Sequence, residues 1–174
     1  MEVMDRKYQF SWELLGDTEL GRPNLGGEIK LEVYRLMQFT LRDILEEELG
    51  TEKSDLIFYA AGRKAGNAFY DHMLSGCTDV KDFIKKLQQV LKDMKIGILR
   101  VESMASNAAK LVLTVDEDVD CSGLPELDYE ICVYDEGFIS GILESFTGSE
   151  YAVKEIDCWC TGERTCRFSA EKKE

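Results

Sequence analysis

Apolar residues recur at helical spacing in three segments of the first half of the chain. The first segment, 28–49, carries aliphatic side chains three or four positions apart, and Gly50 supplies a C-terminal stop. The second segment covers about 55–74 with Ser54 as its N-cap, and the third covers 80–94. The pattern therefore predicts three amphipathic helices before any sheet.

Strand-like alternation of apolar and polar residues marks the N-terminus and much of the second half. Residues 8–12 alternate and lead into a glycine-rich loop. Residues 98–101 and 111–115 are typical of two hairpin strands, joined through Ser106-Asn107. Residues 151–169 alternate again, so we expect them to complete a sheet.

A fourth helical segment, 132–146, interrupts these strands. It carries Gly137 and Gly141 four positions apart, as the second helix carries Gly62 and Gly66. Two glycines one turn apart make a flat helix face, which another helix or a ligand can approach closely. We favour helix packing as the explanation.

The order of these elements predicts an α/β (α+β) fold with helices packed on a mainly antiparallel sheet, because helices and strands come in blocks. The chain has 174 residues, of which 44% are hydrophobic and 32% are charged. This composition is typical of one ordered domain covering 1–174. We expect only a tail from about residue 170 to be flexible.

Charge and hydropathy exclude several classes of protein. The 34 acidic and 21 basic residues give a net charge of −13 at pH 7, which repels phosphate backbones, so we expect no nucleic-acid partner. No run approaches 18 apolar residues and no signal-peptide core is visible, so we expect a cytoplasmic protein without membrane insertion. The six cysteines are then thiols, metal ligands or core residues rather than disulfides.

Three of the cysteines fall in a pattern that favours a metal. Two strand-like runs fold back through a glycine turn and bring Cys158 near Cys166, with Cys132 as the obvious third ligand. Zinc takes four ligands in a tetrahedron, and the fourth is either Glu155 or Cys160. The spacing leaves that choice open.

The alternative is that these cysteines are small core residues, since free cysteine is among the most buried residue types. A single thiol is best explained in that way, and we assign Cys77 and Cys121 to the core on this ground. Three thiols with acidic neighbours within 35 residues favour metal over core.

Five short motifs along the chain carry a resemblance to a known family. In chain order they are Arg22-Pro23-Asn24-Leu25-Gly26, Tyr34-Arg35, Gly62-Arg63-x-x-Gly66, Cys132-x-x-x-x-Gly137-x-x-x-Gly141 and Glu155-x-x-Cys158-x-x-x-Gly162-x-x-x-Cys166-x-Phe168. Together they resemble the 4-vinyl reductase domain family, and the resemblance covers most of the chain. That family includes a protein of bacteriochlorophyll synthesis, sensor domains of phenol-responsive activators and free-standing archaeal hydrocarbon-binding proteins.

The resemblance implies a structural Zn²⁺ held by Cys132, Glu155, Cys158 and Cys166, with Cys160 as an extra thiol and alternative ligand. Four protein ligands leave no open position for water, so we expect a structural clamp and no catalytic residue. The resemblance also implies the fold of trafficking-complex subunits, which enclose a lipid channel, with the zinc hairpin at the C-terminus.

The function that this implies is a zinc-containing module that binds a small apolar or aromatic ligand, as a sensor or carrier. A sensor of this length needs a separate output protein, and its relatives lead us to expect a homodimer. We make no assignment for His72 beyond an ordinary half-exposed histidine. The candidate lining residues of the pocket are Phe58, Tyr59, Phe69, Tyr70, Phe138 and Ile142.

Two alternatives remain open from the sequence. One is a component of a tetrapyrrole-type vinyl reductase, although the chain has no dinucleotide-binding motif, phosphate loop or iron-sulfur spacing. Such a reductase would need a partner to supply electrons. The other is a homodimeric scaffold for protein interaction that packs through its first helix.

Overall fold

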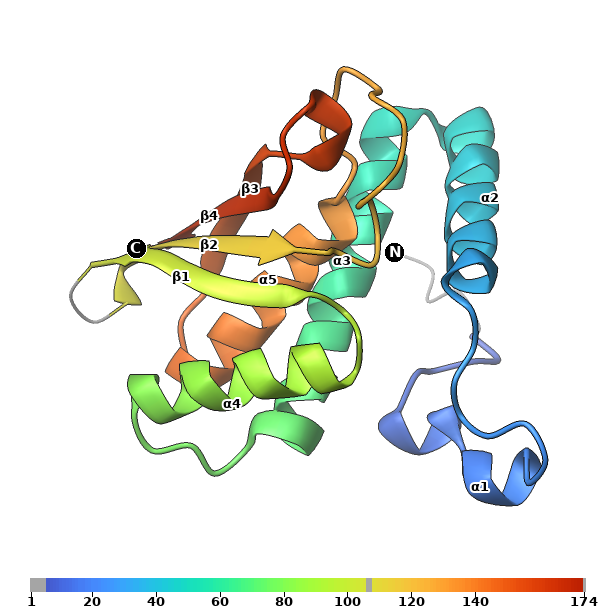
Figure 1. Ribbon diagram of the computed structural model, residues 1–174, viewed down its shortest axis with the longest axis horizontal. Helices are drawn as coiled ribbons and strands as arrows, with labels where there is room; N and C mark the ends of the chain where they lie inside the picture. The colour runs from blue at the N-terminus through green and yellow to red at the C-terminus, as the bar shows by residue number, and fades with distance from the viewer. Residues whose placement is uncertain (1–5, 106–107, 174) are drawn as a thin grey trace.

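A computed structural model describes residues 6–105 and 108–173 of the protein (Figure 1). Helices dominate the first half of the chain, and α3 continues directly into a short π-helical segment, η2. None of the helices in these described ranges is long and apolar enough to cross a membrane. The helical elements are η1 (Trp12–Leu15), α1 (Thr18–Gly21), α2 (Leu31–Leu49), α3 (Thr51–Phe69), η2 (Tyr70–Leu74), α4 (Val80–Asp93), α5 (Val133–Thr147) and η4 (Trp159–Thr161).

Four strands form one sheet in the order β1-β2-β4-β3, and every neighbouring pair is antiparallel. α5 lies between β2 and β3 in the chain, so the sheet is built from two hairpin-like pairs with a helix inserted between them. The expected mixture of helices with an antiparallel sheet is confirmed. The strands are β1 (Ile98–Met104), β2 (Lys110–Asp116), β3 (Tyr151–Asp157) and β4 (Cys166–Lys172).

One face of the sheet is buried and the other meets solvent. Side chains alternate along each strand, so Leu113 of β2 and Phe168 of β4 point into the core while Lys154 of β3 is exposed. The buried face packs with apolar side chains of α4 and α5, including Leu87 and Leu143, in one hydrophobic cluster. This layer between helices and sheet contains the pocket described below.

α3 and α5 pack with their backbones in close contact through the four glycines singled out in the sequence. A methyl group added at Gly66 would lie 2.2 Å from the carbonyl oxygen of Phe138, and one added at Gly137 would lie 2.1 Å from that of Tyr59. Gly62 and Gly141 meet the facing backbone in the same way. The glycine faces therefore serve helix packing.

Several local expectations differ from the structure. Residues 8–12 form no strand, and the chain instead enters the short helix η1 at Trp12. Ser54 lies inside α3 and donates its hydroxyl to the Gly50 carbonyl, because that helix begins one turn earlier. The expected turn at Ser106-Asn107 lies outside the described residues.

The expected flexible tail also differs. β4 continues to Lys172, and Ala170 is fully buried against the core. Glu171 pairs with Lys110 of β2, so the ladder of backbone hydrogen bonds holds the chain in place beyond residue 170.

Candidate metal centre and adjoining pocket

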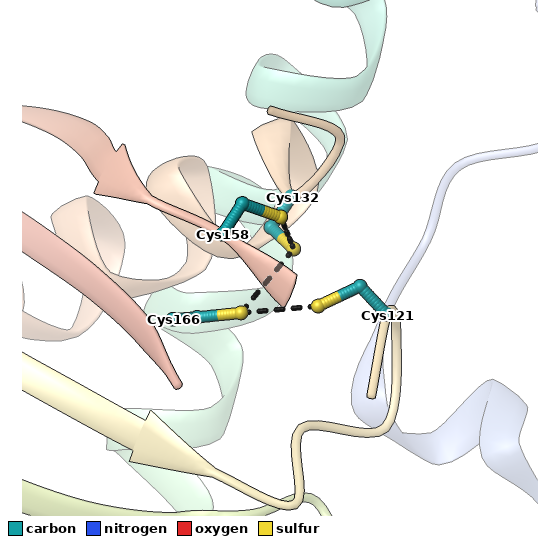
Figure 2. Close-up of side chains that lie close together, drawn as sticks. All are labelled: Cys121, Cys132, Cys158 and Cys166. Carbon is teal, nitrogen blue, oxygen red and sulfur yellow. Dashed lines mark hydrogen bonds between the residues drawn. The ribbon is translucent and has the colours of Figure 1, made fainter. Parts of the chain in front are cut away.

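Four buried cysteines converge at one end of the sheet (Figure 2). The Sγ atoms of Cys121 and Cys166 are 3.0 Å apart, and Cys132 Sγ lies 3.9 Å from the Sγ atoms of both Cys158 and Cys166. All four sulfur atoms lie within 4.8 Å of one another. Each residue has at most 1% of its surface exposed, so solvent does not reach the cluster.

The cysteines come from four separate places in the chain. Cys166 is the first residue of β4 and pairs with Val115, so the chain that leaves the end of β2 passes beside it and carries Cys121. Cys132 immediately precedes α5, and Cys158 follows β3 just after an irregularity in its register.

The segment after Cys158 is fixed by local hydrogen bonds. The backbone N–H of Cys158 donates to the Thr161 hydroxyl at 3.1 Å. The Cys158 carbonyl accepts from that hydroxyl at 2.9 Å and from the Glu163 N–H at 3.2 Å. These bonds hold the Cys158 side chain toward the cluster without help from a metal.

The geometry of the sulfur atoms fits a tetrahedral metal. Zinc–sulfur bonds of about 2.3 Å at tetrahedral angles place sulfur atoms about 3.8 Å apart, close to the two separations of 3.9 Å. To bind zinc, the distance between the Sγ atoms of Cys121 and Cys166 would lengthen from 3.0 Å by less than about 1 Å. Hydrogen bonds among the thiols, those of Cys121 foremost, hold the pKa of Cys158 well below its usual range and raise the pKa of Cys132 and Cys166, so without a metal the cluster favours a single thiolate.

Glu155 lies beside the four-sulfur cluster. Its Oε2 atom accepts a hydrogen bond from the Cys132 N–H at 3.2 Å, while Oε1 is buried without a hydrogen-bond partner among the described residues. Burial raises the pKa of its carboxyl to about 9, and the nearby Cys158 adds to the shift. The resemblance implied Glu155 as the fourth ligand, whereas the structure gathers four sulfur atoms without it.

The two remaining cysteines stay outside the cluster. Cys160 is buried in η4, and burial raises the pKa of its thiol to about 12. Cys77 is half-buried near the start of α4. The sequence assigned Cys121 to the core because it lacks neighbouring cysteines, and only the register of β2 against β4 reveals its partners.

A pocket adjoins the cluster between the sheet and the helices. Its outer part is a cleft of about 740 Å³ lined by the segment 27–31, by Tyr34 of α2, by the α4–β1 connection and by α5. Its inner part is a cavity of about 40 Å³ between α4, β1, β2 and α5. Ile96, Asp135 and Phe138 line both parts, so they form the boundary between cleft and cavity.

The predicted pocket residues divide into two groups. Phe69 and Phe138 line the cleft, and Phe138 and Ile142 line the inner cavity. The other three lie elsewhere: Phe58 packs under the Arg42 guanidinium, the Tyr59 hydroxyl donates to the Tyr151 carbonyl at 3.5 Å, and Tyr70 packs beside Phe83 and Phe146.

His72 takes no part in the pocket lining. Its exposed ring stacks on Trp12 with the ring centroids 4.6 Å apart, and Nδ1 lies 2.9 Å from the Ala68 carbonyl oxygen. These contacts attach the N-terminal segment to the end of the α3–η2 helix.

Three carboxyl groups that the sequence patterns did not single out, those of Asp118, Asp120 and Asp135, lie between the pocket and the cysteines. Asp118 and Asp135 line the inner cavity, and their carboxylate oxygens lie within 4.8 Å of Cys132 Sγ. Burial raises the pKa of Asp118 to about 7, with Asp120 adding to the shift, and burial raises the pKa of Asp135 well above its usual range.

α2 holds the loop that carries these groups. The Tyr34 hydroxyl and the Gln38 amide donate to the two oxygens of Asp120 at 2.7 and 2.8 Å. The Arg35 guanidinium donates to the Val119 and Ser122 carbonyls at 2.8 and 2.9 Å. The loop is thus tied to α2 by polar contacts.

Comparison with known proteins agrees with the resemblance drawn from the sequence. Residues 111–172 match the 4-vinyl reductase domain, and the match covers β2, the cysteine-bearing loops, α5, β3 and β4. An uncharacterized protein of Methanocaldococcus jannaschii is 26% identical over 144 residues, which is 83% of this chain and 78% of that protein. The resemblance to the 4-vinyl reductase domain family is confirmed.

Three solved structures share the fold. The phenol-responsive sensory domain of the transcription activator PoxR, solved with phenol, is 16% identical with a TM-score of 0.62 over 83% of this chain and 75% of that one. A vinyl-4-reductase family protein of M. jannaschii is 15% identical with a TM-score of 0.59 over 86% and 85%. A trafficking protein particle complex subunit 3 from Naegleria fowleri, covalently bound to palmitic acid, is 18% identical with a TM-score of 0.64 over 83% and 95%.

Proposed function

We propose that the protein, whose residues 111–172 match the 4-vinyl reductase domain, is a zinc-containing module that binds a small apolar or aromatic ligand, as a sensor or carrier. The observation that carries this proposal is the cleft of about 740 Å³ that shares part of its wall with an apolar cavity beside four buried thiols. Clefts of roughly 300–1,000 Å³ with apolar walls are typical of small-molecule sites. The phenol-bound sensory domain of PoxR supports the same function by its fold.

The zinc in this proposal is bound by Cys121, Cys132, Cys158 and Cys166. A soft metal prefers four thiolates to three thiolates and a carboxylate, and the four sulfur atoms already lie within 4.8 Å of one another. When bound, the ion supplies structural cross-linking, because four protein ligands leave no position for water. Glu155 then holds the loop before α5 through the Cys132 N–H.

One short loop supports the proposed role as a sensor. Asp118 lines the cavity, Cys121 belongs to the cysteine cluster, and Asp120 between them accepts hydrogen bonds from α2. A ligand that displaces Asp118 therefore acts on α2 through this loop.

We propose that α2 also forms a homodimer interface. Its polar face holds the loop described above, while the opposite face presents apolar side chains with more than half of their surface exposed: Val33 (56%), Leu36 (67%), Met37 (65%), Leu41 (52%) and Ile44 (53%). Figure 1 shows α2 on the outside of the molecule, with α3 between it and α5. A second copy of the same helix is the simplest partner for such a stripe.

Titration of purified protein with toluene by isothermal calorimetry tests the binding function. We expect saturable binding at one site per chain, and we expect it to be lost in Ile96→Trp, which fills the boundary between cleft and cavity. The matched control is Ile156→Trp, which lies on the exposed part of β3 and should bind as the wild type does. Absence of saturable binding by the wild type would contradict the proposal.

A further inference from the structure

The polar groups that line the inner cavity are carboxyl groups alone. Asp118 and Asp135 interrupt a wall that is otherwise aliphatic or aromatic, and no basic residue lines it among the residues that the structure describes. The Oδ2 atom of Asp135 is buried and has no hydrogen-bond partner in the described part of the chain. A buried acceptor left without a donor is costly, so this atom marks the place for a ligand's donor.

From this we propose that the pocket recognises amines: molecules with a small apolar body and a protonated amino group that donates to Asp135 and Asp118. The inference rests on the proposed function, because it names the class of ligand for the same pocket. It departs from a purely hydrocarbon ligand by requiring a positively charged end.

The surrounding groups leave the two acids available. Asp120, the third carboxyl, is already satisfied by Tyr34 and Gln38. The nearby cation, Arg35, directs its guanidinium to main-chain carbonyls. Within the ranges that the structure describes, none of the three carboxyl groups forms an ion pair with a lysine or arginine.

Asp118 and Asp135 are close enough for one ammonium group to reach both. Their carboxylate oxygens lie within 4.8 Å of each other. Two N–H···O bonds of about 2.9 Å at a tetrahedral nitrogen span about 4.7 Å between acceptors. One ammonium nitrogen can therefore donate to both carboxyl groups, and the Asp118 oxygen that accepts from the Asp120 and Cys121 N–H groups helps to hold that side chain in place.

The cleft that leads to these acids also favours a cation. Its aromatic walls include Tyr34, Phe69, Tyr134 and Phe138, which suit both an apolar body and the approach of a positive charge. Its charged lining is acidic on balance, and one of its two lysines, Lys95, is paired with Glu28. An ammonium group between Asp118 and Asp135 would favour the ionised form of both carboxyl groups, whereas a carboxylate would disfavour it.

Four ligands that share one ring test this inference: benzylamine, benzyl alcohol, toluene and benzoate, each titrated into the full chain by isothermal calorimetry. We expect benzylamine to bind at least about tenfold more tightly than benzyl alcohol, and benzoate to bind most weakly. This comparison uses the wild-type protein, so it does not depend on the folding of a variant.

Asp135→Asn supplies the matched variant, because it keeps the shape and cannot ionise when an ammonium group binds. Its affinity for benzylamine should fall about tenfold while its affinity for benzyl alcohol stays within about twofold. The control Glu117→Gln removes an exposed carboxyl from the cleft lining and should change benzylamine binding less than about threefold.

The outcomes separate this inference from the proposed function. Binding of toluene and benzyl alcohol with no preference for benzylamine overturns the amine inference and leaves the apolar pocket standing. Failure of all four ligands to bind overturns both. A preference for benzylamine that Asp135→Asn retains places the amine elsewhere and also overturns the inference.

Discussion

The Sγ atom of Cys121 lies 3.0 Å from the Sγ atom of Cys166, although 45 positions separate the two residues. The antiparallel register of β2 and β4 creates this contact, because Val115 pairs with Cys166 and the chain turns back beside it. The fourth corner of the proposed metal centre is therefore supplied by tertiary structure rather than by a local motif.

Substitution of Gly66 by alanine should destabilise the protein by about 3 kcal/mol, near the upper end for overpacking. The added methyl group would lie 2.2 Å from the Phe138 carbonyl oxygen in α5, so the two helices must separate. The control is Gly21→Ala in α1, where no atom lies within 4 Å and the change should stay below about 0.5 kcal/mol. Urea unfolding of the zinc-loaded proteins measures both, and equal stability of the two variants would contradict the packing argument.

Asp118→Asn should change how stability depends on pH. The pKa of Asp118 rises from 3.8 to about 7 on folding, so the folded protein keeps a proton that the unfolded chain has lost. Folding takes up that proton between about pH 4 and pH 7, and this carboxyl therefore lowers the free energy of unfolding as pH rises through the range.

An amide at position 118 does not ionise, so it does not lower the free energy of unfolding as pH rises. We expect Asp118→Asn to be more stable than the wild type at pH 8, by up to about 4 kcal/mol, and to lose most of this advantage at pH 5. Chemical unfolding of both proteins at the two pH values gives the difference directly. An advantage that is the same at pH 5 and pH 8 would show that Asp118 does not change its protonation on folding.

A charge in the apolar stripe of α2 should break the proposed homodimer. Met37→Glu places a carboxylate among side chains that we expect to meet their own copies, so light scattering at micromolar concentration should change from the mass of two chains to that of one. The control Ile156→Glu adds the same charge on the exposed part of β3 and should leave the mass unchanged. A wild-type protein that is monomeric at these concentrations would refute the interface.

Sequence patterns were sufficient for most of the secondary structure. The aliphatic periodicity of α2 and α4 and the alternation in β1 and β2 predicted these elements within a few residues. Such patterns are local, since each reports which side of a single element is buried. The pattern at residues 8–12 was misleading because five alternating residues have no partner strand in the described part of the chain.

The site was harder to predict because its parts meet only in the tertiary structure. Cys132, Cys158 and Cys166 stood out by spacing, but Cys121 depends on the β2–β4 register. The pocket acid Asp135 lies on α5 at an unspecified position of the Cys132-x-x-x-x-Gly137 motif, and its partner across the cavity belongs to a loop. Aromatic residues alone could not separate Phe138 in the pocket from those packed elsewhere in the protein.

The most direct test of the proposed four-cysteine zinc centre is its metal content, measured by mass spectrometry on protein purified without added metal. We predict one zinc per chain in the wild type, in Cys160→Ser and in Glu155→Gln, and a zinc content well below one per chain in Cys121→Ser, which loses one of the four thiolate ligands. Cys160→Ser is the matched control, since it removes a buried thiol that lies outside the cluster. Full zinc in Cys121→Ser together with zinc lost from Glu155→Gln would contradict the four-cysteine centre and assign the fourth position to the carboxylate.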